Sequence, residues 1–463
     1  MSIHAWLARH LIYPTHERWR GRATLRELAT LRCQTAPSVN ARLQELLMFA
    51  NEKLPYYRDL FARFGVDPCC DSPAAELARL PVLEKADIRA NAGGMVWHDV
   101  PGGVIPHSSG GTTGDTLHFF IDRVRQAQTH AARLFMQGLF GVQPGERRVH
   151  LWGSPIENRR SAWRRRRDWL LNEFVLNAFE MSPAQMDAHL DRLERLRPRL
   201  LYGYPSALAL LARHAVQRGR RSGFDRLGLV VLTGEEVAPH QSALVREVVA
   251  CPIAIEYGSR ETGLIAHECP LGRLHVVSPH VHVEIECDGR AAPKDTCGDI
   301  LCTTLNARAQ PLIRYRIGDA GALLSADCTC GLPFPLLRID GGKVTGFIAL
   351  PDGRLCHGAV TSHVLRDEPG IVEFKTHQRT LELFEVFLVV NDRFDPRTIE
   401  RVRRRYRELF GERIDVRCHV VDRIPPDPSG KRRYVVSDLV DDVGGREIVD
   451  PAELEPTPPR LTV

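Results

Sequence analysis

Apolar residues recur at helical spacing through the first hundred residues, for example in ARLQELLMFANEKL (41–54) and PAAELARL (73–80). This period is typical of amphipathic helices, so residues 1 to about 100 are predicted to be mainly helical. The N-terminal stretch MSIHAWLARHLIYPTHERWRG (1–21) is also amphipathic. We expect it to form a packed first helix, with contact to a membrane surface as the weaker alternative.

Short apolar runs alternate with amphipathic ones from residue 104 to about 250. RVHLW, RLLYGY and LGLVVLTG are predicted to be buried strands, and AQMDAHLDRLERL and SALALLARHAVQRG to be the helices between them. This alternation favours layered α/β structure around a largely parallel sheet.

From residue 274 to about 340 the pattern becomes strand-rich, as in HVHVEIEC, GDILCTTL and PLIRYRI. The Gly-rich break IDGGKVTGF (339–347) separates this unit from a compact segment of strand, helix and strand. The predicted fold class is α/β, with layered α/β subdomains and a β-rich subdomain in a large N-terminal domain, plus a small α+β C-terminal domain. The predicted boundaries are 1–341 for the N-terminal domain, 342–347 for a hinge, 348–440 for the C-terminal domain and 441–463 for a Pro-rich tail.

Composition then narrows the class of protein. Of the 463 residues, 43% are hydrophobic and 26% are charged, which is ordinary for a globular protein. No apolar run reaches the ~18 residues of a membrane span, and the N-terminus lacks the apolar core and cleavage site of a signal peptide. A cytoplasmic protein without a membrane partner is expected. Nucleic acid is not expected either, because a net charge of +5 is too mild to indicate it alone.

The Gly-rich hydroxyl loop SSGGTTGDT (108–116) is the first motif with candidate chemistry. Such loops hold phosphates through backbone N–H groups and hydroxyls, although this one lacks the Lys of a Walker loop. The alternative is an ordinary flexible surface loop, because clusters of Gly, Ser and Thr are common.

Three further motifs contain candidate nucleotide ligands. In EYGSRETG (256–263), an aromatic side chain could stack on a purine and Glu261 could lie near Mg²⁺. Asp319 follows the apolar run in PLIRYRIGDAG (311–321), where a carboxylate can accept hydrogen bonds from ribose hydroxyls. Lys431 lies in a Gly-containing turn. Taken singly, each is more simply read as an ordinary turn residue.

Together these motifs resemble the adenylate-forming (acyl-CoA synthetase-like) superfamily, and most closely its phenylacetate–CoA ligase/CapK-like branch. Ser109–Gly114 is similar to the phosphate loop of that family, and further matches follow in the family's order over residues 45–435. They are GYPSAL (203–208), LTGEEV (232–237), YGSRETG (257–263), GDILCTTL (298–305), PLIRYRIGD (311–319) and PSGKRR (428–433).

The resemblance implies an AMP-forming ligase that uses ATP and Mg²⁺ to adenylate a carboxylic acid. The implied catalytic residues are Lys431, one of only six lysines in the chain, and Glu261 as the Mg²⁺ ligand. The implied ATP-binding residues are Ser109, Gly110, Gly111, Thr112, Thr113, Gly114, Gly234, Glu235, Glu236, Glu256, Tyr257, Gly258, Ser259, Asp319 and Lys343. The implied acyl pocket consists of Trp152, Gly153, Tyr204 and Pro205, which suggests an aromatic or medium-sized acid.

The family's C-terminal domain is mobile and rotates between two half-reactions, and this chain departs from the family at two places. Asp115-Thr116 replaces a frequent Lys-Pro after the phosphate loop, and Asp115 is expected to point away from phosphates. Gly346 replaces the hinge aspartate, and Lys343 stands where an arginine contacts ribose. Glycine can accommodate the large change in backbone dihedral angles that a domain rotation requires, but it does not restrict the rotation to defined positions.

Twelve cysteines in a chain without an export signal argue against a disulfide framework. Cys269, His275, Cys328 and Cys330 have the residue types and the number of ligands that suit a structural Zn²⁺ site, with His267 in reserve. The alternative is buried free cysteines around a core histidine. Zinc at this position in some relatives supports the metal site.

The densest basic run is RRSAWRRRRDW (159–169), which is expected to be a solvated face or to meet a phosphate-bearing partner. The predicted function is acyl-adenylate formation followed by transfer to CoA, an amine or a carrier protein, and the sequence also allows a homodimer. A zinc-braced binding protein without turnover, holding nucleic acid or another partner, is the alternative from another class.

Overall fold

The computed structural model describes residues 3–33, 38–109, 117–153, 162–341, 344–345, 347–351, 355–365, 368–424 and 433–440. Within these ranges no helix is long and apolar enough to cross a membrane.

The N-terminal region is helical, as the apolar spacing predicts. Ser38 caps the long helix of this region by accepting a hydrogen bond from the N–H of Ala41, and Pro55 begins the next helix directly after it. The elements are α1 (Ile3–Leu7), the π-helical turn η1 (Ala8–Ile12), α2 (Tyr13–Trp19), α3 (Thr24–Arg32), α4 (Val39–Lys53), α5 (Pro55–Phe64), α6 (Pro73–Arg79), α7 (Lys85–Ala90) and the short 3₁₀ turn η2 (Ala92–Gly94).

A seven-stranded sheet forms the centre of the molecule, in the order β4-β3-β5-β6-β7-β8-β9. The strands are β3 (Arg148–Trp152), β4 (Glu173–Asn177), β5 (Leu200–Gly203), β6 (Leu229–Thr233), β7 (Ile253–Ser259), β8 (Gly263–Glu268) and β9 (Leu274–Val276). The first five strands of this order are parallel, as the alternating pattern predicts, and the last two are antiparallel. Every residue of β6 is buried, which is the pattern of a parallel strand covered on both faces.

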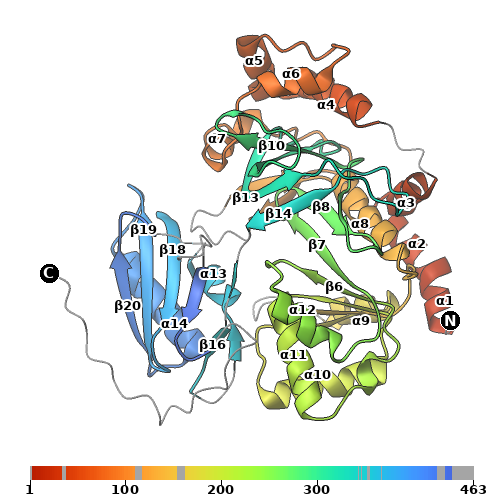
Figure 1. The fold of residues 1–463 in the computed structure, drawn as a ribbon. Coiled ribbons are helices and arrows are strands. Elements are labelled where there is room, and N and C mark those ends of the chain that lie inside the picture. The colour runs from red at the N-terminus through yellow and green to blue at the C-terminus, as the bar shows by residue number, and fades with distance from the viewer. Residues whose placement is uncertain are drawn as a thin grey trace.

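Helices cover this sheet, and α10, α11 and α12 lie together on one face (Figure 1). The other helices that follow the N-terminal region include α8, which packs against α3 and β8. The hairpin β1 (Ile105–Ser108) and β2 (His118–Ile121) leads directly into α8. The helices are α8 (Arg123–Gly138), α9 (Ala162–Leu170), α10 (Pro183–Leu196), α11 (Pro205–Gln217), η3 (Ser222–Phe224) and α12 (Pro239–Arg246).

A second sheet, antiparallel throughout, follows in the chain with the order β11-β10-β12-β13-β14. Its strands are β10 (Val281–Cys287), β11 (Arg290–Ala291), β12 (Gly298–Thr304), β13 (Tyr315–Leu323) and β14 (Leu337–Gly341). The run PLIRYRI becomes a strand only from Tyr315, because Arg314 adopts a φ of 54°, which interrupts an extended backbone.

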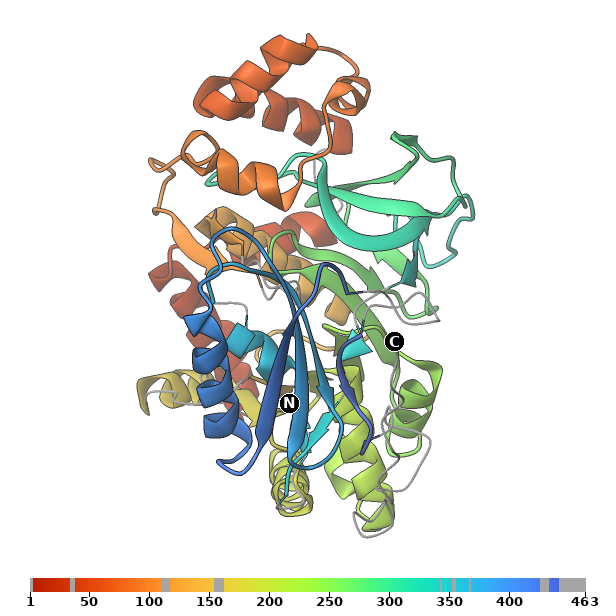
Figure 2. The same cartoon turned by 90° about the vertical axis from the view of Figure 1, so that its left-hand side faces the viewer.

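The last described elements form a third sheet with the order β15-β21-β18-β19-β20 and a separate antiparallel pair, β16 and β17. Its core contains Phe374, Phe384, Tyr406 and Phe410, with the ring of Phe384 stacked on that of Phe410. Figures 1 and 2 show this blue unit beside the central sheet rather than within it. The elements are β15 (Val344–Thr345), β16 (Phe347–Ala349), β17 (Leu355–His357), α13 (Ala359–Leu365), β18 (Ile371–Gln378), β19 (Leu383–Val390), α14 (Arg397–Phe410), β20 (Asp415–Val420) and β21 (Arg433–Ser437). The predicted mixed α/β class is confirmed.

The N-terminal helical rod, residues 3–19, packs closely on the turn before β3. A Cβ at Gly145 would lie 2.5 Å from the backbone nitrogen of Arg9, and the φ of Gly145 is +80°. Glycine at this position therefore allows the rod to approach the turn.

We predict that Gly145→Ala displaces the rod, whereas Gly141→Ala does not. Gly141 has a similar φ of +78° but open space around it, so both variants share the conformational cost and only one adds the clash. Gly145→Ala should lower the unfolding free energy by about 1–3 kcal/mol more than Gly141→Ala, as overpacking typically does. Chemical unfolding measures the difference, and limited proteolysis should show earlier cleavage within residues 3–19. Equal effects of the two substitutions would contradict close packing of the rod.

Candidate functional site

The carboxyl ends of neighbouring parallel strands bring several of the predicted site residues to one edge of the central sheet. Trp152 and Gly153 end β3, Tyr204 follows β5, Gly234 follows β6 and Tyr257 lies near the end of β7. Because β3, β5, β6 and β7 are parallel, these positions lie side by side. Ligands bind at this edge in open α/β sheets.

An aromatic corner occupies part of this edge. The rings of Trp152 and Tyr204 stack with their centroids 4.0 Å apart and their planes 14° apart. Gly234 lies against both rings: its φ is +84°, and a Cβ there would be 3.0 Å from Tyr204 and 3.2 Å from Trp152. Only glycine allows the turn after β6 to approach the stack. Pro205 is buried and begins α11, and Gly153 is buried at the end of β3.

The turn after β6 is tied to the start of α11 by Glu235. The Oε2 atom of Glu235 accepts hydrogen bonds from the hydroxyl of Ser206 at 2.7 Å and from its backbone N–H at 3.2 Å. Glu236, next in the chain, is half-buried. The carboxylate of Glu235 thus serves to hold the turn at residues 234–236 in place.

The central sheet and the β-rich sheet are joined by a hydrogen bond between two predicted nucleotide ligands. The hydroxyl of Tyr257 on β7 donates to Oδ2 of Asp319 on β13 at 3.0 Å. Burial, together with the charge of Asp319, raises the pKa of Tyr257 well above its ordinary value. The phenol therefore keeps its proton and remains a donor to the carboxylate.

The turn between β7 and β8 contains Glu261 in a fixed, buried setting. A Cβ at Gly258 would lie 2.3 Å from the backbone oxygen of Gly263, so this close approach requires glycine. The hydroxyl of Ser259 accepts a hydrogen bond from the N–H of Thr262 at 3.0 Å. Glu261 is 7% exposed, and its backbone lies within this hydrogen-bonded turn.

A buried arginine from α8 holds this turn from below. Arg125 donates through Nη2 to the backbone oxygens of Arg260, at 3.0 Å, and Glu261. Burial lowers the pKa of Arg125 to about 10, and the charges of Asp122 and Glu261 oppose that shift. The side chain stays positively charged at neutral pH, beside the carboxylate of Glu261.

Glu256 lies on the opposite side of β7 from Tyr257, as neighbouring residues of a strand do. Its buried carboxylate accepts hydrogen bonds from Nε of Arg133 at 2.9 Å and from the hydroxyl of Tyr202 at 2.8 Å. Glu256 therefore supports the strand beneath the edge, away from the side on which Tyr257 meets Asp319.

The phosphate-loop motif begins at a neck that the structure describes. Ser109 is fully buried, its N–H donates to the oxygen of Leu117 at 2.8 Å, and its Oγ accepts from the N–H of Leu117 at 2.9 Å. Arg260 reaches the oxygen of Ser108 at 3.5 Å, so the neck lies beside the turn that contains Glu261. The other predicted ligands lie outside the described residues; they are Gly110, Gly111, Thr112, Thr113, Gly114, Lys343 and Lys431, together with the departures Asp115, Thr116 and Gly346.

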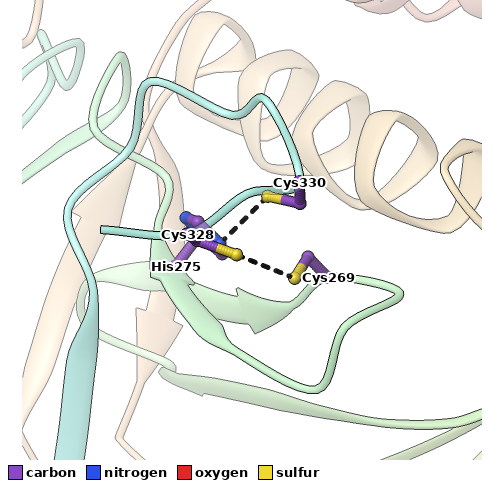
Figure 3. A group of neighbouring side chains, drawn as sticks. All are labelled: Cys269, His275, Cys328 and Cys330. Carbon is purple, nitrogen blue, oxygen red and sulfur yellow. Dashed lines mark hydrogen bonds between the residues drawn. The ribbon is translucent and has the colours of Figure 1, made fainter. Parts of the chain in front are cut away.

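Four side chains at a different edge form a compact candidate metal centre (Figure 3). Cys269 follows β8, His275 lies on β9, and Cys328 and Cys330 lie on the loop between β13 and β14. Their ligand atoms all lie within 4.8 Å of one another. The Sγ atoms of Cys269 and Cys328 are 3.8 Å apart, and Sγ of Cys330 is 3.3 Å from Nε2 of His275.

These distances fit a tetrahedral zinc ion. Zn–S bonds of about 2.3 Å at tetrahedral angles place two sulfurs about 3.8 Å apart. The Nδ1–H of His275 donates to the oxygen of Phe334 at 2.9 Å, which leaves Nε2 facing the cysteines. Such a hydrogen bond fixes the ring of a metal ligand. His267 does not belong to this cluster: it is fully buried on β8, with Nδ1 bonded to the oxygen of Glu268 at 2.7 Å.

The sequence did not reveal the residues that support the site from below. Asp122 could have been found, because Asp directly before a helical pattern signals an N-cap, and its carboxylate accepts from the N–H of Arg125 at 2.8 Å. Arg125 and Arg133 gave no such signal, since arginine on an amphipathic helix is normally assigned to the solvent face. Only the packed structure shows that Arg125 is buried and that Arg133, which is half-buried, pairs with Glu256.

Comparison with known proteins gives this geometry a context. Residues 348–438 match the family described as the CapK C-terminal domain. The protein CapK of Staphylococcus aureus is 21% identical over 416 residues, covering 86% of this chain and 88% of CapK. The phenylacetate-coenzyme A ligase of Pseudomonas putida is 25% identical over 385 residues, covering 76% of this chain and 78% of the ligase.

Residues 348–438 are a CapK C-terminal domain, and most of the chain is similar to the CapK/phenylacetate–CoA ligase branch of the adenylate-forming superfamily. A ligase of the same name from Thermus thermophilus is 25% identical over 307 residues, covering 63% of this chain and 66% of the ligase. The fold is that of a 2-hydroxyisobutyryl-CoA ligase solved with 2-HIB-AMP and CoA. That structure has a TM-score of 0.59 and 18% identity, and the match covers 88% of this chain and 90% of that one.

We predict that Arg125→Met loosens the turn that contains Glu261. The substitution removes two hydrogen bonds from a charged donor and leaves two carbonyl oxygens without them. Hydrogen bonds to charged groups contribute about 1.5–3 kcal/mol each, so unfolding free energy should fall by at least about 2 kcal/mol. Arg123→Met is the matched control, because Arg123 also lies on α8 and donates to backbone oxygens, at Arg20 and Gly102. Amide hydrogen exchange at residues 258–263 should become faster in Arg125→Met but not in Arg123→Met. Unchanged exchange in Arg125→Met would refute the role of Arg125 in holding this turn.

Proposed function

We propose that the protein activates a carboxylic acid with ATP, forming an acyl-adenylate and releasing pyrophosphate, and then transfers the acyl group to CoA or another acceptor. Similarity to the CapK/phenylacetate–CoA ligase branch supports this proposal, since the relatives of this chain include phenylacetate-coenzyme A ligases. The similarly folded 2-hydroxyisobutyryl-CoA ligase was solved with both an acyl-adenylate and CoA.

The observation that carries the proposal is the hydrogen bond between Tyr257 and Asp319 at the carboxyl edge of the sheet. This hydrogen bond fixes a carboxylate beside an aromatic ring. Both lie at the edge of the sheet at which the turn of residues 234–236 follows β6. An adenosine would place its base between that turn and Tyr257, and its ribose hydroxyls would donate to Asp319. Lys343 would add a second ribose contact.

Adenylation is mainly a problem of charge. Two anions, the carboxylate and the α-phosphate, must meet, and negative charge then grows on the phosphoryl oxygens and the leaving pyrophosphate. Preorganised cations and N–H donors stabilise such a transition state. We assign Lys431 to bridge the acid and the α-phosphate, and Thr112 and Thr113 to bind the β- and γ-phosphates.

Glu261 is the residue that would hold Mg²⁺. One or two carboxylates plus substrate phosphates are the usual Mg²⁺ environment, and Glu261 lies in a fixed turn beside the neck of the phosphate loop. When bound, the metal would supply positive charge to the pyrophosphate as it leaves. Arg125, below the same turn, keeps the backbone of Glu261 in position.

The acyl group would meet the aromatic corner. The stacked pair of Trp152 and Tyr204 forms a rigid apolar wall beside Gly234, which suits a flat aromatic or medium-sized acid. The acceptor stays open between CoA, an amine and a carrier-protein thiol. A rotation about residues 342–347 would withdraw Lys431 after adenylation and admit that acceptor.

We also propose that Cys269, His275, Cys328 and Cys330 bind a structural Zn²⁺. All four tetrahedral positions would be filled by protein ligands, which is the arrangement of structural rather than catalytic sites. The ion would tie β8 and β9 of the central sheet to the loop that enters β14 of the β-rich sheet. It would thus reinforce the junction that the Tyr257–Asp319 bond makes elsewhere.

A binding protein that keeps this fold without turnover is the second candidate. Asp115 next to the phosphate loop and Gly346 in place of the hinge aspartate favour it, because both depart from the ligase pattern. Such a protein would bind a partner but would not exchange pyrophosphate.

The test of adenylation is ATP–pyrophosphate exchange without CoA over a panel of aryl, aliphatic and amino acids. We expect exchange with at least one acid and a loss of at least about 10³-fold in Lys431→Ala, the size of effect seen when a transition-state charge partner is removed. Lys375→Ala, on β18 outside the site, is the control and should keep its exchange. Pyrophosphate exchange that persists in Lys431→Ala would refute the role assigned to Lys431. A wild-type protein that neither exchanges pyrophosphate nor binds ATP would favour the non-catalytic binding protein.

The zinc site is tested by metal analysis and by thiol substitution. We expect one zinc per chain in the purified protein, and none in Cys328→Ser/Cys330→Ser. The double variant should unfold at least about 5 °C lower, because metal-binding free energy contributes to folding. Cys33→Ser, at an exposed cysteine outside the cluster, should keep both zinc and the unfolding midpoint. A metal-free wild type with an unchanged midpoint in the double variant would exclude the ion.

A further inference from the structure

The N-terminal rod of α1, η1 and α2 presents its large apolar residues to solvent. Ile3, Trp6 and Leu11 are 82%, 51% and 59% exposed, and Leu7 is exposed beside them. Their spacing of i, i+3, i+4 and i+8 places them on one stripe of the rod. The buried face contains Ala5, Ala8 and Tyr13 instead, which is the reverse of an ordinary surface helix.

The rod is nevertheless docked firmly. Its backbone at Arg9 packs on Gly145, and the ring of Tyr13 lies edge-on to that of His130 on α8, with centroids 6.2 Å apart. The buried carboxylate of Glu17 accepts hydrogen bonds from Arg22 and Thr24. The exposed stripe is therefore held outward by the fold, and it is not the result of a loose end.

A second element extends the apolar surface. The ring of Trp169, at the end of α9, lies 5.1 Å from that of His4 between ring centroids, and Trp169 is 55% exposed. Leu170 beside it is exposed as well. Contiguous exposed apolar surface of this kind marks an interaction site in globular proteins. In Figure 1, α1 and α2 lie on the opposite side of the molecule from the C-terminal sheet.

Positive charge gathers in the sequence in and around the same two segments. Residues 3–19 contain two arginines and one glutamate, residues 166–170 contain two arginines and one aspartate, and the adjoining residues add more arginines. Residues 3–32 contain six arginines and two glutamates, and residues 162–170 contain four arginines and one aspartate. They sum to +4 and +3, whereas the whole chain has +5, so the rest of the chain sums to −2. Arg18 and Arg166, among these arginines, are exposed.

We propose that this surface, formed by residues 3–19 and 166–170, docks the protein on an anionic lipid bilayer. Trp, Ile and Leu on one face of a helix, with arginines around them, is the pattern of helices that lie in the membrane interface. Anionic headgroups attract the arginines, and each basic residue near the surface adds about 1 kcal/mol. This departs from the expectation of no membrane partner, and it does not rest on the proposed enzymatic function.

Two other occupants fit less well. A second copy of the chain would bring two faces of like positive charge together. Nucleic acid would satisfy the arginines, but it offers little to exposed Ile3, Leu7 and Leu11. A bilayer with anionic lipids satisfies the charge and the aliphatic side chains together.

The experiment is vesicle flotation of the full chain. Vesicles of phosphatidylcholine that contain about 30 mole per cent phosphatidylglycerol should bind the protein at low salt. Vesicles of pure phosphatidylcholine should bind it at least about 10-fold more weakly. Raised salt should weaken binding, since exposed charges are screened. Tryptophan emission should shift to shorter wavelength as Trp6 and Trp169 enter the interface.

The decisive variant is Trp6→Ser/Leu11→Ser, which should bind the anionic vesicles at least about 10-fold more weakly while its unfolding midpoint stays within about 2 °C of the wild type. Met48→Ser and Val420→Ser are matched controls at apolar residues 49% and 51% exposed elsewhere, and both should bind like the wild type. Two results would overturn the proposal. One is the absence of binding of the wild type to anionic vesicles at low salt.

The other is undiminished binding of the double variant, which would show that charge alone attracts the protein. A dimer in light scattering that the double variant dissociates would instead identify a second copy as the occupant.

Discussion

The hydrogen bond from Tyr257 to Asp319 is the constraint on which the candidate site depends, because it joins the central sheet to the β-rich sheet at the carboxyl edge. One partner lies on β7, which is parallel to β6 and antiparallel to β8, and the other lies on an antiparallel strand of a different sheet. The two sheets also share a hydrophobic core, and this contact adds a polar link at the place where the aromatic ring and the carboxylate meet. The high pKa of Tyr257 keeps the donor protonated, so the link persists through the range where proteins work.

Buried charge under the edge makes the same site rigid. Arg133 pairs with Glu256 below β7, and Arg125 holds the turn at Glu261 from α8. Breaking such pairs is costly, because a charge left alone in the interior loses water without gaining a partner. The helix α8 therefore links the neck of the phosphate-loop motif, at its start, to the strand that presents Tyr257. A site built in this way is positioned before a nucleotide binds.

The C-terminal sheet, the N-terminal rod and the candidate metal centre lie at three different places in the molecule. The C-terminal sheet, whose rotation the proposed mechanism requires, lies across the molecule from the N-terminal rod (Figure 1). A protein docked through the rod would leave that sheet free to move. The candidate metal centre lies at a third position, between β8, β9 and the loop before β14, where it would hold the two larger sheets together.

The sequence by itself determined the elements and the type of fold. Apolar runs such as LVVL predicted buried parallel strands, and β6 is indeed covered on both faces. The helical spacing in residues 184–196 predicted α10. Local patterns of this kind follow from burial of one face or two, which a single segment already encodes. The order of short motifs also indicated the family, and the Cys and His residues that cluster in space were named from their types and number.

Only the tertiary structure decided which residues meet across elements. Arg125 and Arg133 looked like solvent-facing residues of an amphipathic helix. Arg125 is buried against backbone oxygens of the turn after β7, and Arg133 is half-buried against the carboxylate of Glu256 on β7. His267 could not be separated from the four clustered ligands by spacing, since it faces a different neighbour on β8. The N-terminal stretch, residues 1–21, was predicted to form a packed first helix, but its sequence did not show which face would be buried. In the structure Ala5, Ala8 and Tyr13 are buried, and Gly145 permits the close approach of the backbone at Arg9 because it has no Cβ.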